Sequence, residues 1–154
     1  MNKCYQLIGV PGSGKSTWIK NQDWTVDIPV VSTDRFVEEY AEREGKTYSE
    51  VFDEYMPIAV RLMANQVEIC KANGKDIIWD QTSTTEKSRA RKFNMLPDYY
   101  HIAVVFKVPE LPELLRRLNS RPGKIIPFDV VEGMIKNFEP PSLDEGFKEI
   151  WIAT

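Results

Sequence analysis

A nine-residue stretch near the N-terminus, GVPGSGKST at positions 9–17, contains three glycines followed by a lysine and two hydroxyl residues. Its G-x-x-x-x-G-K-S spacing matches the Walker A pattern, in which a glycine-rich loop directs its backbone N–H groups at the phosphates of a nucleotide. Lys15 is expected to reach the β and γ phosphates of ATP, and Ser16 to bind Mg²⁺ through its hydroxyl. The residues predicted to bind the nucleotide are Gly9, Pro11, Gly12, Ser13, Gly14, Lys15, Ser16 and Thr17.

The chain on either side of this loop supplies the two elements that the pattern requires. The run CYQLIGV before it is typical of a short buried strand, and KSTWIKNQ after it can begin a helix whose N-terminus favours negative charge. Glycine and proline also mark ordinary turns. The order of strand, loop with Lys and Ser, and helix favours phosphate binding over a plain turn.

Two aspartates follow predicted strands, Asp34 in VVSTDRF and Asp80 in IIWDQTST. Because ligands of a parallel sheet bind beyond the carboxyl ends of its strands, both carboxylates are expected at the edge that carries the glycine-rich loop. Asp34 is predicted to be a catalytic base, since phosphate transfer to a hydroxyl requires a group that accepts the proton. The alternative role for Asp34 is an N-cap of the following helix.

Asp80 ends four residues that fit a loose Walker B pattern, which predicts a place for it near Mg²⁺ together with Ser16. Thr82, in the polar loop that follows, is predicted to hydrogen-bond the substrate. A polar loop before a helix has the same composition, so both interpretations of Thr82 stand. The residues predicted to bind the substrate are Asp34, Arg35, Asp80 and Thr82.

The segment LLRRLNSRPGKIIP places Arg117 and Arg121 four residues apart, hence on one face of a helix that Pro122 and Gly123 would end. We interpret residues 116–128 as a lid whose arginines, with Arg116 and Lys124 nearby, close over the γ-phosphate and neutralise charge during transfer. A solvated basic helix end is the alternative.

A second basic segment, EKSRARK, places Lys87 and Arg91 four residues apart, with Arg89 and Lys92 alongside. It fits a patch that follows a phosphate backbone or an ordinary soluble helix face, and the second interpretation is favoured.

Short apolar runs alternate with longer amphipathic ones, which predicts an α/β domain with a mainly parallel sheet. Five strands are expected, at residues 4–9, 29–32, 76–79, 101–108 and 149–152. A long helical segment follows the capping-box pair Thr47 and Glu50, and Pro57 marks the point where it would break into two helices. Ser83 and Glu86 are predicted to form a second capping box.

The composition is that of one α/β domain spanning residues 1–154, with 42% hydrophobic residues, 28% charged residues and a net charge of −3. No apolar run is long enough to span a bilayer and no signal-peptide pattern opens the chain, so a cytoplasmic protein without a membrane partner is expected. Cys4 and Cys70 lack CxxC spacing and are predicted to be buried reduced thiols without a disulfide partner. His101 is expected to be a strand-end residue.

Five segments together resemble the P-loop kinase domain of the phage-type polynucleotide 5′-hydroxyl kinases and the related small AAA-33-type ATP-binding kinases: GVPGSGKSTW, VVSTD, WDQTST, RLNSRPGKIIP and FEPPSLDEGF. The resemblance covers nearly the full chain and implies a three-layer P-loop NTPase fold with a helical lid. It implies a nucleic-acid substrate with a 5′-hydroxyl. The roles that it implies are contacts to ATP and Mg²⁺ for Lys15 and Ser16, phosphate binding for Arg117 and Arg121, the general base for Asp34 and a second active-site carboxylate for Asp80.

One position departs from the resemblance. The polynucleotide kinases commonly carry D-x-x-R, whose arginine contacts a substrate phosphate, whereas this chain has Val37 at that position and offers Arg35 instead. An ATP-dependent polynucleotide 5′-hydroxyl kinase is therefore the leading prediction, and a small-molecule or nucleoside kinase of the same fold is the first alternative. The second alternative is a nucleotide-dependent binding module that hydrolyses ATP slowly.

Overall fold

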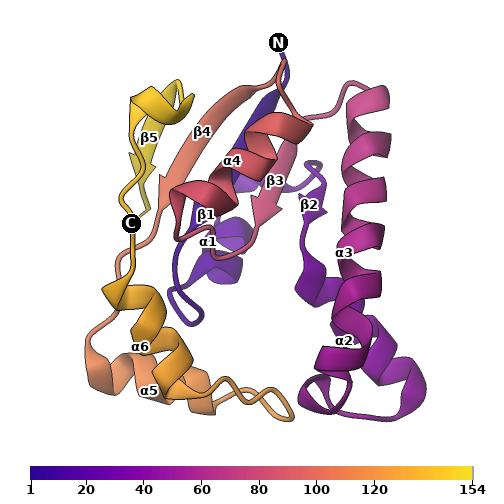
Figure 1. The fold of residues 1–154 in the computed structure, drawn as a ribbon, viewed down its shortest axis with the longest axis vertical. Coiled ribbons are helices and arrows are strands. Elements are labelled where there is room, and N and C mark those ends of the chain that lie inside the picture. The colour runs from indigo at the N-terminus through magenta and orange to yellow at the C-terminus, as the bar shows by residue number, and fades with distance from the viewer. Residues whose placement is uncertain (154) are drawn as a thin grey trace.

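Five parallel strands form the centre of the molecule, in the order β2-β3-β1-β4-β5 (Figure 1). The computed structural model describes residues 1–153. The strands are β1 (Lys3–Ile8), β2 (Val30–Val31), β3 (Ile77–Asp80), β4 (Tyr100–Val105) and β5 (Glu149–Ile152). The predicted α/β class and the parallel five-stranded sheet are confirmed, with every strand boundary within three residues of its predicted place.

Six α-helices and two short 3₁₀ turns connect these strands. They are α1 (Lys15–Asn21), η1 (Asp23–Thr25), α2 (Thr33–Glu44), α3 (Tyr48–Ala72), α4 (Glu86–Met95), α5 (Leu111–Asn119), α6 (Phe128–Lys136) and η2 (Leu143–Glu145). No helix within residues 1–153 combines the length and the apolar composition that crossing a membrane requires.

Side chains on both faces of the sheet are buried, because successive residues of a strand point to opposite sides. Cys4 and Trp79 pack on one face with Val67 of α3. On the other face Tyr5 and Ile78 pack in a cluster that partly buried residues of α1 adjoin. The result is the predicted three-layer arrangement, with helices on each side of the sheet.

The chain order of the strands determines where a ligand can bind. After β1 the chain crosses to the edge strand β2, returns to β3 beside β1, and then continues on the other side with β4 and β5. The direction of the strand order thus reverses at β1, and in such sheets ligands bind in the crevice at this point. The glycine-rich loop follows β1 directly and lies at that crevice.

Helix α3 is continuous through Pro57, so the predicted break at this proline is wrong. A proline inside a helix removes one backbone hydrogen bond, but burial can hold the helix together across it. Val51 and Ala59, on either side of Pro57, are fully buried and pack in one cluster with Val37 of α2. The predicted capping box is confirmed: the Glu50 N–H donates to Thr47 Oγ1 over 3.2 Å, and the Thr47 N–H donates to Glu50 Oε1 over 3.0 Å.

The second predicted capping box is displaced by two residues. Thr85 and Ser88 form it, and Ser83 instead lies in the preceding loop with a φ of +48°. This loop is held by backbone bonds, because the Gly9 N–H donates to the Thr82 carbonyl and the Glu139 N–H donates to the Thr84 carbonyl, each over 2.9 Å. These contacts delay the start of α4 to a point that local sequence does not specify.

Both cysteines are buried, as predicted, and are free thiols. Burial raises the pKa of the Cys4 thiol far above its usual range, so this group is an inert part of the core. His101 lies in β4 and is buried. One of its ring nitrogens lies 3.0 Å from Gln6 Nε2 and the other 2.8 Å from the Leu96 carbonyl oxygen, so it is a core residue.

Candidate functional site

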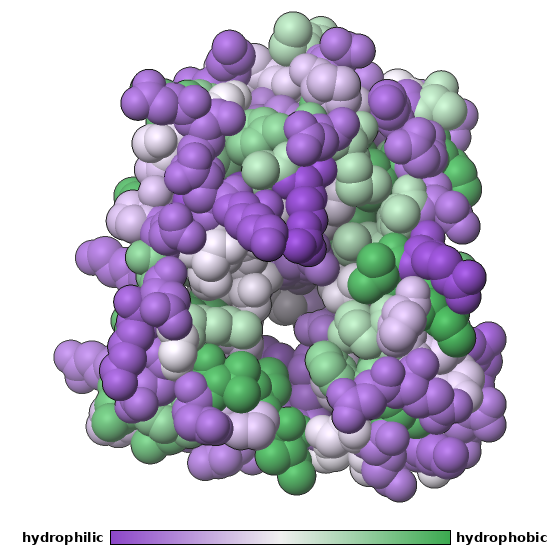
Figure 2. All heavy atoms as spheres, viewed as in Figure 1, coloured by the Kyte–Doolittle hydropathy of each residue, from purple (hydrophilic) through white to green (hydrophobic). Residues whose placement is uncertain are grey.

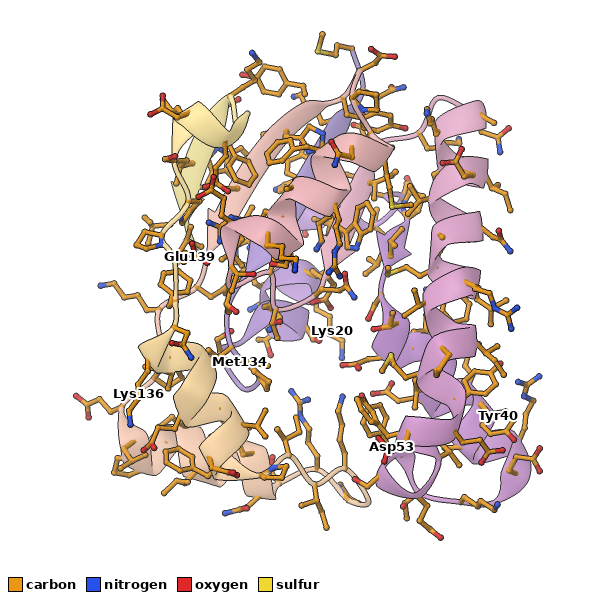
Figure 3. All side chains as sticks on the ribbon, in the orientation of Figure 1. Lys20, Tyr40, Asp53, Met134, Lys136 and Glu139 are labelled. Atoms are coloured by element: carbon orange, nitrogen blue, oxygen red, sulfur yellow. The ribbon has the colours of Figure 1, made fainter. Side chains whose placement is uncertain are left out.

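A cleft of about 1710 Å³ opens at the carboxyl edge of the sheet. Figure 2 shows the molecule hollowed here, between the sheet and the helices that follow it in the lower half of the view. In Figure 3, Met134 of α6 and Asp53 of α3 lie on opposite sides of the opening, and both line it. Pockets for one small molecule usually measure about 300–1000 Å³, so this cleft has room for a nucleotide and a second substrate.

The predicted site residues come together in this cleft, although they come from four separate segments of the sequence. All of them line it except Gly9: Pro11, Gly12, Ser13, Gly14, Lys15, Ser16, Thr17, Asp34, Arg35, Asp80, Thr82, Arg117 and Arg121. Gly9 lies behind the loop, where a Cβ atom would come within 2.5 Å of Ser13 Oγ. It therefore contributes close packing to the loop.

The glycine-rich loop has the conformation expected of a phosphate-binding loop. Gly12 and Gly14 have φ angles of +83° and +100°, which favour glycine, and such turns direct successive backbone N–H groups into one concavity. The Ser13 hydroxyl is buried and has no hydrogen-bond partner within residues 1–153. Lys15 Nζ donates to the carbonyl oxygens of Gly9 and Val10 over 2.8 and 3.1 Å. An unpartnered buried hydroxyl and a partly buried ammonium at one loop fit an anionic ligand.

We expect nucleotide affinity to fall as the pH rises above about 8. Burial lowers the pKa of Lys15 to about 8, an effect that Asp80 and Asp34 partly oppose. Phosphates bind the ammonium form, so above this pH nucleotide binding must also take up a proton. The dissociation constant then rises roughly tenfold per pH unit.

Calorimetry in buffers of different ionisation enthalpy measures both the affinity and the proton uptake. A Lys15→Arg variant provides the control, because a guanidinium stays charged throughout this range. A parent protein whose affinity stays flat from about pH 7 to about pH 9.5 would contradict the assignment of Lys15.

Asp80 ends β3, is partly buried and lines the cleft. Burial raises the pKa of its carboxyl, and the Lys15 ammonium opposes this effect. Its carboxylate and the Ser16 hydroxyl are hard oxygen donors that line one cleft, as Mg²⁺ prefers. No group of three or more His, Cys, Asp or Glu side chains within residues 1–153 is arranged to hold a metal. A site with few protein ligands fits Mg²⁺, which usually keeps several waters and substrate phosphates in its coordination shell.

Asp34 lies in the first turn of α2, and its carboxylate contacts two other elements. Tyr48 Oη of α3 donates to Oδ1 over 2.6 Å, and Lys124 Nζ donates to Oδ2 over 3.1 Å. Burial and the bond to Asp34 raise the pKa of Tyr48, so its hydroxyl remains a donor. Ser32, not Asp34, holds the N-cap position of α2, which removes the capping alternative. The side chain of Asp34 is 49% exposed and is open to the cleft.

The structure adds Tyr48 to the site, a residue that the sequence interpretation missed. Its only local signal is its position directly after Thr47, the N-cap of α3. Lys124, considered only as a spare cation of the lid, proves to be the residue of the lid that contacts Asp34. Neither partner of Asp34 is specified by sequence spacing.

The two predicted lid arginines lie differently from the prediction. Helix α5 ends at Asn119, so Arg117 is in the helix and Arg121 lies in the following loop, and the two do not share a helical face. Arg117 Nη1 donates to the Gly12 carbonyl over 3.0 Å and Nε to Glu113 over 2.8 Å, which attaches α5 to the glycine-rich loop. Arg116 and Arg117 lower the pKa of Glu113 to about 2. Arg121 lines the cleft and is exposed.

The position of the missing arginine is closed to a substrate. Val37 is fully buried between α2 and α3. Arg35 lines the cleft, but its side chain is 61% exposed and forms an ion pair of 3.8 Å with Glu39. The cation that donates a hydrogen bond to Asp34 is instead Lys124.

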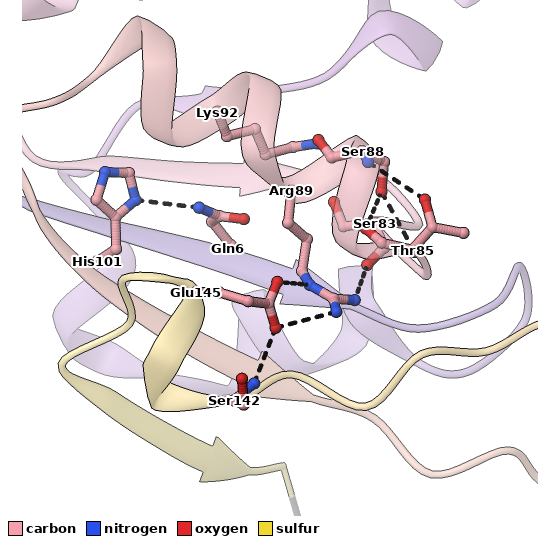
Figure 4. Close-up of polar contacts among 9 residues, drawn as sticks. All are labelled: Gln6, Ser83, Thr85, Ser88, Arg89, Lys92, His101, Ser142 and Glu145. Carbon is pink, nitrogen blue, oxygen red and sulfur yellow. Dashed lines mark hydrogen bonds and ion pairs between the residues drawn. The ribbon is translucent and has the colours of Figure 1, made fainter.

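The interpretation of EKSRARK as an ordinary soluble face is wrong for two of its residues (Figure 4). Arg89 is fully buried, and its guanidinium donates to both oxygens of Glu145, over 2.8 and 3.1 Å, and to the Ser83 carbonyl. Lys92 is buried, with Nζ 5.4 Å from the ring centroid of Trp79. These residues attach α4 to η2 and to the sheet, and none of this segment lines the cleft. The segment therefore gives no support to a nucleic-acid substrate.

Comparison with known proteins agrees with this architecture. The profile of the family AAA_33, described as an AAA domain, matches residues 6–141. No curated protein matches the chain significantly.

Solved structures of low sequence identity share the fold. A protein of Chloroflexus aurantiacus with a provisional kinase assignment aligns with a TM-score of 0.70 at 18% identity, covering 98% of this chain and 84% of its own. A chain of the Pnkp1/Rnl/Hen1 RNA repair complex aligns with a TM-score of 0.66 at 23% identity, covering 88% of this chain and 43% of its own. A gluconokinase of Sinorhizobium meliloti aligns with a TM-score of 0.56 at 16% identity, covering 97% and 81%.

Proposed function

Because the chain belongs to the AAA_33 family of AAA domains and has the fold of P-loop kinases, we propose that it is an ATP-dependent kinase acting on the 5′-hydroxyl of a polynucleotide. The observation that carries the proposal is the position of Asp34. Its half-exposed carboxylate lines the same cleft as Lys15 and Ser16 but forms no part of the glycine-rich loop. A base positioned apart from the nucleotide loop is what transfer to a hydroxyl requires.

In the proposed reaction each residue has a separate task. Asp34 accepts the proton of the acceptor hydroxyl as the hydroxyl oxygen forms a bond to the γ-phosphorus. At the same time the bond between that phosphorus and the β–γ bridging oxygen breaks, which leaves ADP. Lys15 and the loop N–H groups hold the β and γ phosphates. Arg121, in the loop past α5, neutralises charge that spreads over the transferred group.

Mg²⁺ fits the same scheme. Ser16 and Asp80 would hold it, and when bound it neutralises charge on the β and γ phosphates. Arg117, which contacts the Gly12 carbonyl, keeps α5 against the loop and orients the lid, which we place at residues 116–128 of a single domain.

The charge of the cleft supports an anionic acceptor. Its lining contains twice as many basic side chains as acidic ones, although the whole chain has a net charge of −3. The basic side chains are Lys15, Lys20, Arg35, Lys107, Arg116, Arg117, Arg121 and Lys124, and the acidic ones are Asp34, Glu38, Asp53 and Asp80. A local positive field attracts a phosphate chain whatever the net charge of the protein.

An aromatic surface lies near Asp34. Tyr48 and Phe52 of α3 both line the cleft, with ring centroids 5.5 Å apart, and Met56 lines it one turn further on. Aromatic rings in a basic groove are the usual stacking surface for unpaired bases. One structural neighbour belongs to an RNA repair complex, which agrees with an acceptor of this class.

The second candidate is a kinase for a small neutral acceptor such as a sugar. Buried Val37, at the position where the polynucleotide kinases carry an arginine, favours this reading, and one neighbour is a gluconokinase. A slow ATPase that acts as a binding module is the third candidate, and the half-exposed Asp34 opposite the nucleotide loop argues against it.

A transfer assay with γ-labelled ATP separates these candidates. We expect label in 5′-hydroxyl oligonucleotides, with 5′-phosphorylated oligonucleotides as the matched control that cannot accept it. The apparent acceptor affinity should fall with salt by roughly 0.7 in log K per log unit of salt for each strand phosphate neutralised. Label in neutral sugars or nucleosides alone, with a salt-independent KM, would favour the small-molecule kinase, and release of free phosphate alone would favour the ATPase.

A further inference from the structure

Lys124 is the most buried cation of the lid. Its side chain is 8% exposed, and Nζ lies 3.1 Å from Asp34 Oδ2, 3.4 Å from Glu38 Oε1 and 4.4 Å from the ring centroid of Tyr48. Lysine is rarely buried unless it is paired, and here one ammonium contacts two carboxylates and the face of an aromatic ring. The arrangement places a lid residue directly on the proposed base.

The lid segment around Lys124 is attached to the start of α3. The Ser49 N–H donates to the Gly123 carbonyl over 3.1 Å, and the Ile125 N–H donates to Ser49 Oγ over 2.9 Å. Ser49 lies in the first turn of α3, where backbone N–H groups have no partner within the helix. Gly123 has a φ of +70°, and a Cβ atom on it would come within 2.9 Å of Thr47, so this attachment requires glycine. Figure 1 shows the segment between α5 and α6 reaching across to α2 and α3.

The two oxygens of Asp34 are therefore held from two sides. Tyr48 of α3 holds Oδ1 and Lys124 of the lid holds Oδ2. Glu38 lies one helical turn beyond Asp34, and like charges at this spacing repel each other. Without the ammonium between them, the Asp34 carboxylate would be free to turn away from the cleft while Tyr48 remained its only partner.

We propose that Lys124 is a positioning residue that couples attachment of the lid to orientation of the Asp34 carboxylate, so that the base is set for transfer only while residues 123–125 lie against α3. The proposal rests on the proposed function for its effect on catalysis. The backbone bonds at Ser49 attach the lid, and Lys124 transmits that attachment to the base. The groups that Lys124 Nζ contacts are Asp34, Glu38 and Tyr48, so we infer that its effect on transfer is exerted through the base.

The test compares Lys124→Met with Lys124→Arg and with Lys136→Met. Methionine keeps the stem of the side chain without the charge, and arginine restores the charge. Lys136, on α6, forms an exposed ion pair with Glu132 and does not line the cleft, so it is the matched control (Figure 3). We expect Lys124→Met to lower kcat by roughly 10²-fold, the scale for a displaced catalytic group, with the Kd for ATP within about twofold of the parent. Lys124→Arg should recover most of kcat, and Lys136→Met should equal the parent.

Hydrogen exchange of the Ser49 and Ile125 amides provides a readout that does not depend on transfer. Lys124→Met should speed the exchange of both amides, and Asp34→Asn should do so as well because coupling is reciprocal. If the parent phosphorylates no acceptor but these exchange changes occur, the proposed function fails and the coupling holds. Unchanged exchange in both variants, or equal loss of kcat and of ATP affinity in the Met and Arg variants, would overturn the role of Lys124.

Discussion

Replacing Lys15 by methionine is expected to lower the rate of phosphate transfer by about 10³-fold or more, the scale for losing a positive charge at a transferred phosphate. Methionine preserves the apolar stem, so the loop that carries Gly12 and Gly14 should keep its shape. The ammonium cannot be replaced from nearby, because Arg117 is engaged with the Gly12 carbonyl and Glu113. Single-turnover assays with labelled ATP measure the rate.

The control for this variant is its folding. Lys15 is partly buried, so circular dichroism and thermal unfolding should be compared with the parent. Within residues 1–153, Lys15 Nζ donates only to the backbone carbonyls of Gly9 and Val10, so removing this partly buried ammonium should leave stability near that of the parent or raise it slightly. A folded Lys15→Met protein with parental turnover would overturn the assignment of the glycine-rich loop to phosphate binding.

Asp34→Asn is expected to lower kcat by about 10²–10⁴-fold, the range for loss of a general base, while the Kd for ATP stays near its parental value. The amide cannot accept the proton of the acceptor hydroxyl. Its oxygen can still accept a bond from Tyr48 or Lys124, and Asp34 does not occupy the N-cap position of α2, so the fold should survive. Equilibrium nucleotide binding and single-turnover transfer, measured on one preparation, separate chemistry from binding.

Substitutions at two other aspartates provide the control for this experiment and the test of the alternative base. Asp98→Asn is the matched control, because Asp98 is exposed and does not line the cleft, and it should transfer at the parental rate. Asp80→Asn tests the alternative base. If Asp34→Asn transfers phosphate normally and Asp80→Asn does not, the base is Asp80, and the role proposed for Asp34 must be withdrawn.

The conformation of the glycine-rich loop could be predicted from sequence because its determinants are local. Glycines at positions 12 and 14 permit the positive φ angles, and the residues before and after them have the pattern of a strand and a helix. The alternation of apolar runs likewise predicted the parallel sheet. Because the carboxyl ends of parallel strands meet at one edge, Asp80 and the first turn of α2 could be placed beside the loop before any coordinates were known.

The surroundings of Asp34, the proposed base, were decided by tertiary structure. Lys124 is 90 residues from Asp34 and reaches it only because the lid attaches to the first turn of α3. Arg89 has the sequence signature of a solvated helix, yet it is buried by Glu145, a partner 56 residues away. Helix α3 passes through Pro57 because its packing against α2 outweighs the local preference to break. Spacing along one element predicts which side chains share a face. Ion pairs and buried charges depend instead on which elements come into contact, and those contacts are determined by the packing of the whole chain.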